Sequence, residues 1–349
     1  LVECGNRVDS VGLYEGEKRA ELKLDALSGK YPFTLVVPQQ ALEETLRAQL
    51  AERGVKILWN HRLAGLEQRE DSVTARIERL SKESTGYSVS RTEWVVDKSF
   101  AIQASIVVGA DGHRSSVRRI LEIDYEDQGD PHVFGVFEFV TDVEPLHELQ
   151  VVLLEDSTSV LWPMTDGRFR WSFELAESLE KTDPRVKSRL LVQVRDEPYP
   201  HVTQEKLQEL ISERAPWFSA PVKEVLWSAA IRFERRLAGS FGKDRVWLVG
   251  DAAHLALPMG IQSMNIGFRE SADLTWRIIS ALANPDSIAL LEGYGDQWRS
   301  EWQQLLELGT KLKARENTDP WIAERVSRIP PCVPVSGADM NVLFQQLGL

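Results

Sequence analysis

Apolar residues repeat with a helical period between residues 41 and 53. In ALEETLRAQLAER, the residues Leu42, Leu46 and Leu50 are regularly spaced on one side, which predicts an amphipathic helix. The apolar run VKILW, residues 55–59, follows directly and predicts a short strand. A helix followed by a strand is half of a parallel βαβ unit, so this part of the chain favours a parallel sheet.

A two-residue period marks residues 63–96, where apolar and polar side chains alternate on both sides of the polar stretch SKESTGYS. This pattern predicts an antiparallel meander inserted on the parallel sheet. Two continuous apolar runs, 106–108 and 246–249, are each followed directly by a glycine. Such runs are typical of strands that are buried on both faces.

Residues 132–175 contain short β-branched or aromatic runs separated by Asp, Gly or Pro, which predict a second, antiparallel sheet. Residues 184–219 are helical by periodicity, and residues 225–236 return to a strand pattern. From the second glycine stop to about residue 316 the pattern is again helical. Leu207, Leu210 and Ile211 share one face of the predicted helix and are expected to be buried. The large aromatic residues Trp276, Trp298 and Trp302 are also expected to pack in the interior.

Composition narrows the class of protein. The chain has 349 residues, of which 43% are hydrophobic and 27% charged, as in a soluble globular protein of about two domains. A net charge of -12 argues against a nucleic-acid surface, and no run is apolar enough to span a membrane. Cys4 and Cys332 lie near opposite ends without the spacing of a metal site, which favours two reduced thiols in a cytoplasmic protein.

Candidate chemistry lies where the two apolar runs end, in GADG at 109–112 and GDAAH at 250–254. Ligands of open α/β sheets bind beyond the carboxyl ends of the strands, and glycines there allow close approach to the backbone. A carboxylate at such a place accepts hydrogen bonds from hydroxyls, so it suits a ribose or ribitol chain and repels a bare phosphate. A single Gly-Asp pair is better explained as a turn with a helix cap, but two of them favour a ligand site.

The segments GADGHRSSVR and GDAAHLALPMGIQSMNIGFRESADLTWRI resemble the second and third fingerprints of the FAD-dependent aromatic hydroxylases, the flavoprotein monooxygenases of the p-hydroxybenzoate hydroxylase type. PFTLVVPQQALEETL resembles the family segment whose glutamine contacts FAD. The resemblance covers nearly the whole chain in the right order. It implies an α/β (mixed α+β) fold, with a Rossmann-like FAD-binding domain carrying an inserted β-meander and a second domain with an antiparallel sheet. The expected boundaries are 1–126 and 236–349 for the FAD-binding domain and 127–235 for the substrate-binding domain.

The resemblance also implies roles for individual residues. Asp251 would bind the flavin ribitol hydroxyls, and Pro258 would lie beside the isoalloxazine ring. Backbone amides near Met264 and Asn265 would face the flavin pyrimidine edge, because a helix N-terminus offers unpaired N–H groups and partial positive charge to a reduced flavin. Gln39, rather than Gln40, would contact FAD. The full set of expected cofactor-binding residues is Gln39, Asp111, Gly112, Gly250, Asp251, Pro258, Gly260, Met264 and Asn265, with Asp111 and Gly112 also in the motif that handles NAD(P)H.

Some positions depart from the family pattern. Ile261 and Ser263 stand where the family commonly has glycine, and Glu270 stands where Asp is usual. The first family fingerprint, G-x-G-x-x-G, which holds the FAD pyrophosphate, is absent from the sequence. Together with a first residue that is Leu1, this absence predicts that a segment carrying the fingerprint is missing upstream, whereas the C-terminal tail resembles that of compact family members.

The activity implied by the resemblance is hydroxylation of an aromatic or polyketide-like small molecule. NADH or NADPH would reduce FAD, O2 would add at flavin C4a, and the hydroperoxide would deliver one oxygen to an electron-rich ring. The sequence identifies no catalytic base and no metal site. His254 is interpreted as part of the flavin loop or its packing, and His113 as a solvent-side loop residue. Arg232 and Arg235 fit either the face of a strand or an anion site. Trp162, Pro163 and Met164 could line a pocket or pack between the domains.

Two other functions stay open at this point. The fold would also suit an isoprenoid reductase or a halogenase, although the halogenase motif W-x-W-x-I-P does not occur in the sequence. The chain could also be a fragment that holds no FAD, in which case it would purify colourless or aggregate because a sheet edge is open.

Overall fold

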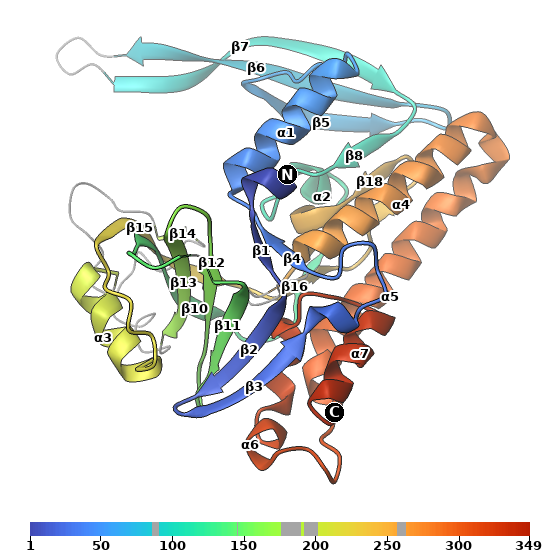
Figure 1. The fold of residues 1–349 in the computed structure, drawn as a ribbon. Helices are drawn as coiled ribbons and strands as arrows, with labels where there is room; N and C mark the ends of the chain where they lie inside the picture. Colours follow the sequence, from blue (N-terminus) through green and yellow to red (C-terminus); the bar gives the residue numbers. More distant parts are fainter. Residues whose placement is uncertain (86–90, 145, 176–189, 192–201, 257–262) are drawn as a thin grey trace.

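The computed structural model describes residues 1–349 except 86–90, 145, 176–189, 192–201 and 257–262 (Figure 1). A large sheet lies at the lower left of the view, two long helices run along the right, and a long meander crosses the top. The fold class expected from the sequence, mixed α and β with more than one sheet, is confirmed.

The predicted second sheet is the largest element of the fold. It has eight strands, and its central strands are antiparallel as predicted. In sheet order the strands are β14 (Leu190–Leu191), β15 (Glu224–Phe233), β10 (His132–Val140), β13 (Arg168–Leu175), β12 (Thr158–Pro163), β11 (Glu148–Leu153), β2 (Ser10–Glu15) and β3 (Lys18–Lys23). The sequence patterns did not reveal that β2, from near the N-terminus, pairs in parallel with β11. Strands from residues 10–23 therefore share one sheet with strands from residues 132–233.

Apolar clusters lie on both faces of this sheet. One face packs against α3 (Gln204–Arg214), where Leu207, Leu210 and Ile211 are buried as predicted. The other packs against the C-terminal elements α6 (Pro320–Ala323), η7 (Val326–Arg328), η8 (Pro330–Cys332) and α7 (Ala338–Gln346). Both layers come from residues far apart in the sequence.

The second part of the fold is built around β8 (Val107–Gly109) and β18 (Val246–Leu248), which are parallel neighbours, with β17 (Gly242–Lys243) at the side of β18. A third core packs here against α2 (Ser116–Ile120), α4 (Ser263–Ala283) and α5 (Ala289–Lys311). Trp298 and Trp302 are buried as predicted. Trp276 is 60% exposed, so its predicted packing role is wrong; it lies on a face of α4 that the described residues leave uncovered.

Smaller sheets connect these parts. The predicted meander is confirmed as the antiparallel strands β5 (His61–Gln68), β6 (Val73–Thr85) and β7 (Arg91–Ala104). One further sheet pairs β1 (Asn6–Val8) with β4 (Thr34–Val36). Another has the strand order β19 (His254–Leu255), β16 (Arg236–Ala238) and β9 (Tyr125–Asp127). The remaining short helices are η1 (Val2–Cys4), η2 (Leu24–Ala26), η5 (Gly250–Ala252) and η6 (Pro285–Ile288). None of the helices in the described part of the chain is long and apolar enough to cross a membrane.

Two predictions about the parallel sheet are wrong. Residues 41–53 do form a helix, α1 (Gln39–Glu52), but residues 55–59 form no strand, because no described strand lies beside them to supply hydrogen bonds. The run that ends in β8 is not buried on both faces, since Val108 is 41% exposed. β8 is an edge strand, so described residues pair with it only on the side of β18.

Candidate functional site

The two glycine–aspartate turns lie side by side because their strands are parallel neighbours. Trp247 is in register with Val108, and Leu248 with Gly109. The pairing continues past the strand ends, where the Val249 amide donates to the Gly109 carbonyl at 3.1 Å. Both turns therefore leave the sheet at the same edge, which is where ligands of open α/β sheets bind.

The first turn has a clear structural role. The Asp111 carboxylate accepts hydrogen bonds from the amides of Ser116, at 2.6 Å, and Val117, at 3.2 Å. Ser115 Oγ accepts from the Arg118 amide at 2.9 Å, so both side chains cap α2. Gly112 has a φ of 78°, and an added Cβ there would meet open space. The helix-cap interpretation of this Gly-Asp pair is thus confirmed, whereas its contact with FAD or NAD(P)H stays a prediction.

The second turn has a more open environment. Gly250 has a φ of 62°, and an added Cβ would have no atom within 4 Å. The Asp251 side chain is exposed, and its backbone carbonyl accepts a hydrogen bond from the Tyr125 hydroxyl at 3.0 Å. Met264, which is 58% exposed, and the exposed Asn265 lie in the first turn of α4. The predicted residues Pro258 and Gly260, together with Ile261, fall outside the described residues.

Gln39 is exposed at the first position of α1. Its Nε2 donates to Glu43 Oε1 at 2.7 Å, and Gln40 makes the same contact with Glu44 at 2.8 Å. Both side chains therefore lie along the helix surface, and neither hydrogen bond favours one of them as the FAD contact.

A buried arginine joins the two turns. Arg118, 6% exposed, donates from Nη1 to the Ala252 carbonyl and from Nη2 to the His113 carbonyl, each at 2.8 Å. Its guanidinium carbon lies 3.7 Å from the centroid of the Tyr125 ring. Burial lowers the pKa of Arg118, while Tyr125 and Asp111 oppose that shift. The cation is thus placed to fix both turns relative to each other.

Next to this arginine is a cavity of about 450 Å³ rich in positive charge. Arg236 in its wall is paired with Glu234 at 2.7 Å and Asp127 at 3.1 Å, whereas Arg114 and Arg119 are exposed. The lining residues are His113, Arg114, Arg118, Arg119, Tyr125, Glu234, Arg236 and Leu255. In a chain with a net charge of -12, this concentration of arginines makes the cavity suited to an anion.

A buried polar network lies beneath the second turn. His254 Nε2 is 2.6 Å from Glu270 Oε2, and the His254 ring stacks on Trp302 with centroids 3.6 Å apart. Trp302 Nε1 donates to Glu270 Oε2 at 3.3 Å, and the Tyr294 hydroxyl lies 2.8 Å from Glu270 Oε1. His254 is 3% exposed, so its interpretation as a packing residue is confirmed. The sequence signal for Glu270 was its position on the apolar face of an amphipathic helix.

The remaining candidates take mainly structural positions. Met164 is 4% exposed, and Trp162 packs beside it against the core of the large sheet. The Pro163 carbonyl accepts a hydrogen bond from Asn6 Nδ2 at 3.2 Å. Arg232 lies in β15, and Arg235 follows that strand. Among the described residues no group of His, Cys, Asp and Glu could hold a metal ion, and both cysteines are free thiols.

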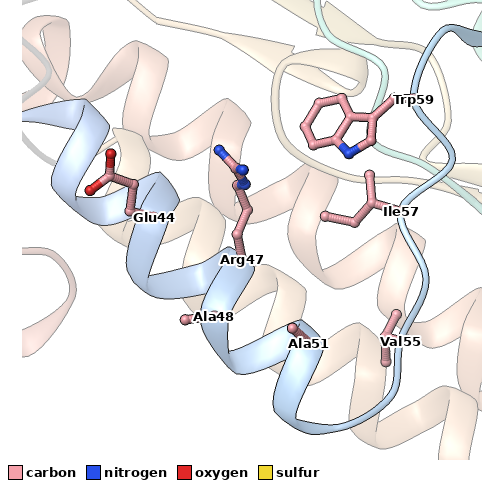
Figure 2. A pocket seen from close by; sticks show the side chains of 7 residues that line it. All are labelled: Glu44, Arg47, Ala48, Ala51, Val55, Ile57 and Trp59. Atoms are coloured by element: carbon pink, nitrogen blue, oxygen red, sulfur yellow. The ribbon is translucent and has the colours of Figure 1, made fainter.

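A second cavity, of about 410 Å³, lies between α1 and the segment 55–59. Figure 2 shows Glu44, Arg47, Ala48 and Ala51 on the helix facing Val55, Ile57 and Trp59 across the gap. Arg47 lies over the Trp59 ring at 5.5 Å, and α1 buries none of its residues. This open cavity combines two charged side chains with exposed apolar ones.

The second turn and the first turn of α4 fit the polyol and ring of a flavin. Gly250 leaves space at the backbone, Asp251 offers an exposed carboxylate acceptor, and the start of α4 offers exposed residues beside amides that a helix leaves unpaired. The described residues near these turns include no phosphate-binding glycine loop.

Comparisons with known proteins agree with this chemistry. A family model described as FAD binding domain matches residues 2–308. The 12-dehydrotetracycline 5-monooxygenase/anhydrotetracycline 6-monooxygenase of Streptomyces rimosus is 28% identical over 278 residues, which cover 78% of this chain and 50% of that protein. This chain spans about half the length of the curated relatives it matches.

Solved structures show the same fold. The p-nitrophenol 4-monooxygenase of Pseudomonas putida superimposes with a TM-score of 0.65 at 17% identity, over 99% of this chain and 82% of that one. A flavin-dependent halogenase gives a TM-score of 0.66 at 13% identity, over 99% of this chain and 58% of that one. The chain belongs to the FAD binding domain family and has relatives among the aromatic and polyketide hydroxylases of the p-hydroxybenzoate hydroxylase type.

Proposed function

We propose that this chain forms the flavin-ring and substrate part of an FAD-dependent monooxygenase that uses NAD(P)H and O2 to hydroxylate an aromatic or polyketide-like molecule. The observation that carries the proposal is the parallel pairing of β8 with β18, which brings the two glycine–aspartate turns to one sheet edge. FAD, when bound, supplies the redox chemistry. The protein residues bind it, orient it and exclude water.

Asp251 and the start of α4 would hold two ends of the flavin. The exposed Asp251 carboxylate would accept hydrogen bonds from ribitol hydroxyls. Amides near Met264 and Asn265 would donate to the pyrimidine edge of the ring, where the helix N-terminus favours negative charge. Asp111 would act through α2, since its carboxylate already caps that helix.

The arginine-lined cavity supports the use of a nicotinamide dinucleotide. Arg114 and Arg119 are exposed at this cavity, and Arg118 connects its wall to the second turn. Guanidinium groups bind phosphate oxygens through paired donors, so the pyrophosphate of NADH or NADPH suits this cavity. The proximity of the cavity to Asp251 would place the dinucleotide close to the flavin.

The class of substrate comes from the relatives. Those at 25–28% identity are named for tetracycline-type, phenylpropionate, chlorophenol and rifampicin substrates. We propose the large sheet as the substrate-binding face. Glu138 is in register with Trp227 on one side and Arg170 on the other, and Arg170 donates to Glu138 at 2.9 Å. Such a row offers both an aromatic surface and polar groups for a phenol.

The test is an assay of the protein saturated with FAD, using NADH or NADPH and a panel of phenols under 18O2. We expect at least one phenol to speed NAD(P)H oxidation and to gain one 18O atom. Oxidation that requires chloride and yields a chlorinated ring would indicate a halogenase, and oxygen-independent reduction of an alkene would indicate a reductase. A panel that produces none of these changes in a flavin-bound protein would contradict the proposal.

A second candidate is a chain that holds no FAD by itself. The observation that favours it is the uncovered apolar surface of α1, the segment 55–59 and edge strand β8, with Leu50 at 36%, Trp59 at 64% and Val108 at 41% exposure. Purification without added flavin tests it directly. A colourless or aggregating protein supports this candidate, whereas a yellow protein with one FAD per chain contradicts it.

A further inference from the structure

The two halves of the proposed flavin site reach it from different elements. Asp251 lies in η5, just after β18, whereas Met264 and Asn265 lie in the first turn of α4. The residues that join them, 257–262, are not among those described. A flavin can contact both halves only if their separation is fixed by other parts of the protein.

Glu270 is the residue that connects all the elements concerned. It is fully buried on α4, where its Oε2 lies 2.6 Å from Nε2 of His254, two residues after η5, and accepts a hydrogen bond from Trp302 on α5. Its Oε1 lies 2.8 Å from the Tyr294 hydroxyl, which is also 2.8 Å from the carbonyl of Leu248 at the end of β18. Burial raises the pKa of Tyr294, so this hydroxyl stays a donor.

We infer that Glu270 is a positioning residue that holds the turn at 250–252 and the first turn of α4 at a fixed separation. This inference rests on the proposed function for its consequence, the binding of flavin, but the anchoring itself depends only on the contacts of Glu270. A buried carboxylate that accepts several hydrogen bonds is held rigidly. If the carboxylate moved, each of its donors would lose its partner, which costs free energy in the interior.

The length of the side chain matters for this role. Aspartate keeps the charge but is shorter by one carbon–carbon bond, about 1.5 Å, so it cannot reach His254 and Tyr294 from the same backbone position. Methionine nearly keeps the length but replaces the carboxylate with an apolar end, so His254 and Trp302 lose their acceptor. Both variants should therefore release the turn.

Asp273 provides a matched control on the same helix. Its Oδ2 accepts from Trp298 Nε1 at 2.8 Å and from Arg277 Nε at 2.9 Å, so it also links α4 to a tryptophan of α5. Unlike Glu270, Asp273 makes no hydrogen bond to the second turn within the described part of the chain. Asp273→Asn should loosen the packing of α4 on α5 without moving Asp251.

The experiment compares wild type, Glu270→Met, Glu270→Asp and Asp273→Asn in the full chain by hydrogen–deuterium exchange and riboflavin titration. We expect amides of residues 250–256 to exchange at least tenfold faster in both Glu270 variants and unchanged in Asp273→Asn. Riboflavin affinity should fall at least tenfold in the Glu270 variants only. Equal exchange of this segment in Glu270→Met and Asp273→Asn would overturn the inference.

Two further outcomes separate the inference from the proposed function. If the exchange changes as expected but wild type binds no riboflavin, the anchoring stands and the proposed flavin site is wrong. If the Glu270 variants do not fold, His254→Gln and His254→Leu replace them. The glutamine amide still donates to Glu270 and should keep the turn protected, whereas leucine should expose it; equal protection in these two variants would also overturn the inference.

Discussion

Arg118 on α2 donates a hydrogen bond to the carbonyl oxygen of Ala252 at 2.8 Å, and this bond joins two residues that are 134 positions apart in sequence. The same guanidinium bonds the His113 carbonyl and stacks on Tyr125, whose hydroxyl bonds the Asp251 carbonyl. The two glycine–aspartate segments are therefore parts of one hydrogen-bonded unit. Chemistry at either turn depends on the geometry of both.

Arg118→Leu should destabilise this unit strongly. The variant leaves the buried Ala252 carbonyl and the half-buried His113 carbonyl without their donor, each at a cost of about 1–3 kcal/mol, so the free energy of unfolding should fall by about 2–4 kcal/mol in urea denaturation. Arg119→Leu is the control, because Arg119 is exposed and its loss should change stability by less than about 1 kcal/mol. Similar losses in the two variants would show that Arg118 has no special structural role.

The arginine-lined cavity should bind the phosphate-containing half of a nicotinamide dinucleotide. We expect ADP-ribose to bind to wild type. Its affinity for the double variant Arg114→Gln/Arg119→Gln should be at least tenfold lower, because both removed cations line the cavity. Calorimetric titration at two salt concentrations measures this, and the affinity should decrease with salt. Arg62→Gln, a change at an exposed meander arginine paired with Glu78, should leave binding unchanged. An equal loss in Arg62→Gln would indicate only non-specific attraction.

The two thiols should differ sharply in reactivity. Cys4 is exposed, whereas Cys332 is buried in the core of the large sheet, where burial raises the pKa of its thiol to about 12. At pH 8 a thiol reagent should modify Cys4 rapidly and Cys332 only after the chain unfolds. Rapid modification of both thiols in the folded chain would contradict the burial of Cys332.

The raised pKa of Cys332 also predicts a pH dependence of stability. In the unfolded chain the thiol loses its proton near its ordinary pKa of 9.0, but in the folded chain only near 12. The contribution of this group is therefore complete below pH 9 and is lost as the pH rises toward 12. Wild type should lose stability over this range faster than Cys332→Ala, by up to about 1.4 kcal/mol per pH unit. Parallel stability curves for the two proteins would show that the thiol does not contribute.

The sequence predicted those features that depend on local pattern. Alternation identified the meander and the central strands of the large sheet, and periodicity placed Leu207, Leu210 and Ile211 on the buried face of α3. The predictions of a strand at 55–59 and of a buried Val108 were both wrong for the same reason. An apolar run indicates what a segment can pair with, but not whether a partner strand lies beside it.

The local patterns of the sequence did not predict contacts between residues that are far apart in the chain. The pairing of β2 with β11, the bond from Arg118 to Ala252 and the contacts of Glu270 join segments with no common pattern. For Asp111 the sequence is compatible with a helix cap or a ligand site, and only the position of α2 reveals the cap. A buried carboxylate on an amphipathic helix is the one such feature that leaves a sequence signal, as a charge on the apolar face.

Asp251 should receive the ribitol chain of a flavin, and a comparison of riboflavin with lumiflavin, which lacks the ribitol, tests this role most directly. Fluorescence titration should show that wild type binds riboflavin at least tenfold more tightly than lumiflavin. In Asp251→Ala this preference should disappear, with stability nearly unchanged because the side chain is exposed. Equal affinities in wild type, or a riboflavin preference that persists in Asp251→Ala, would contradict the account.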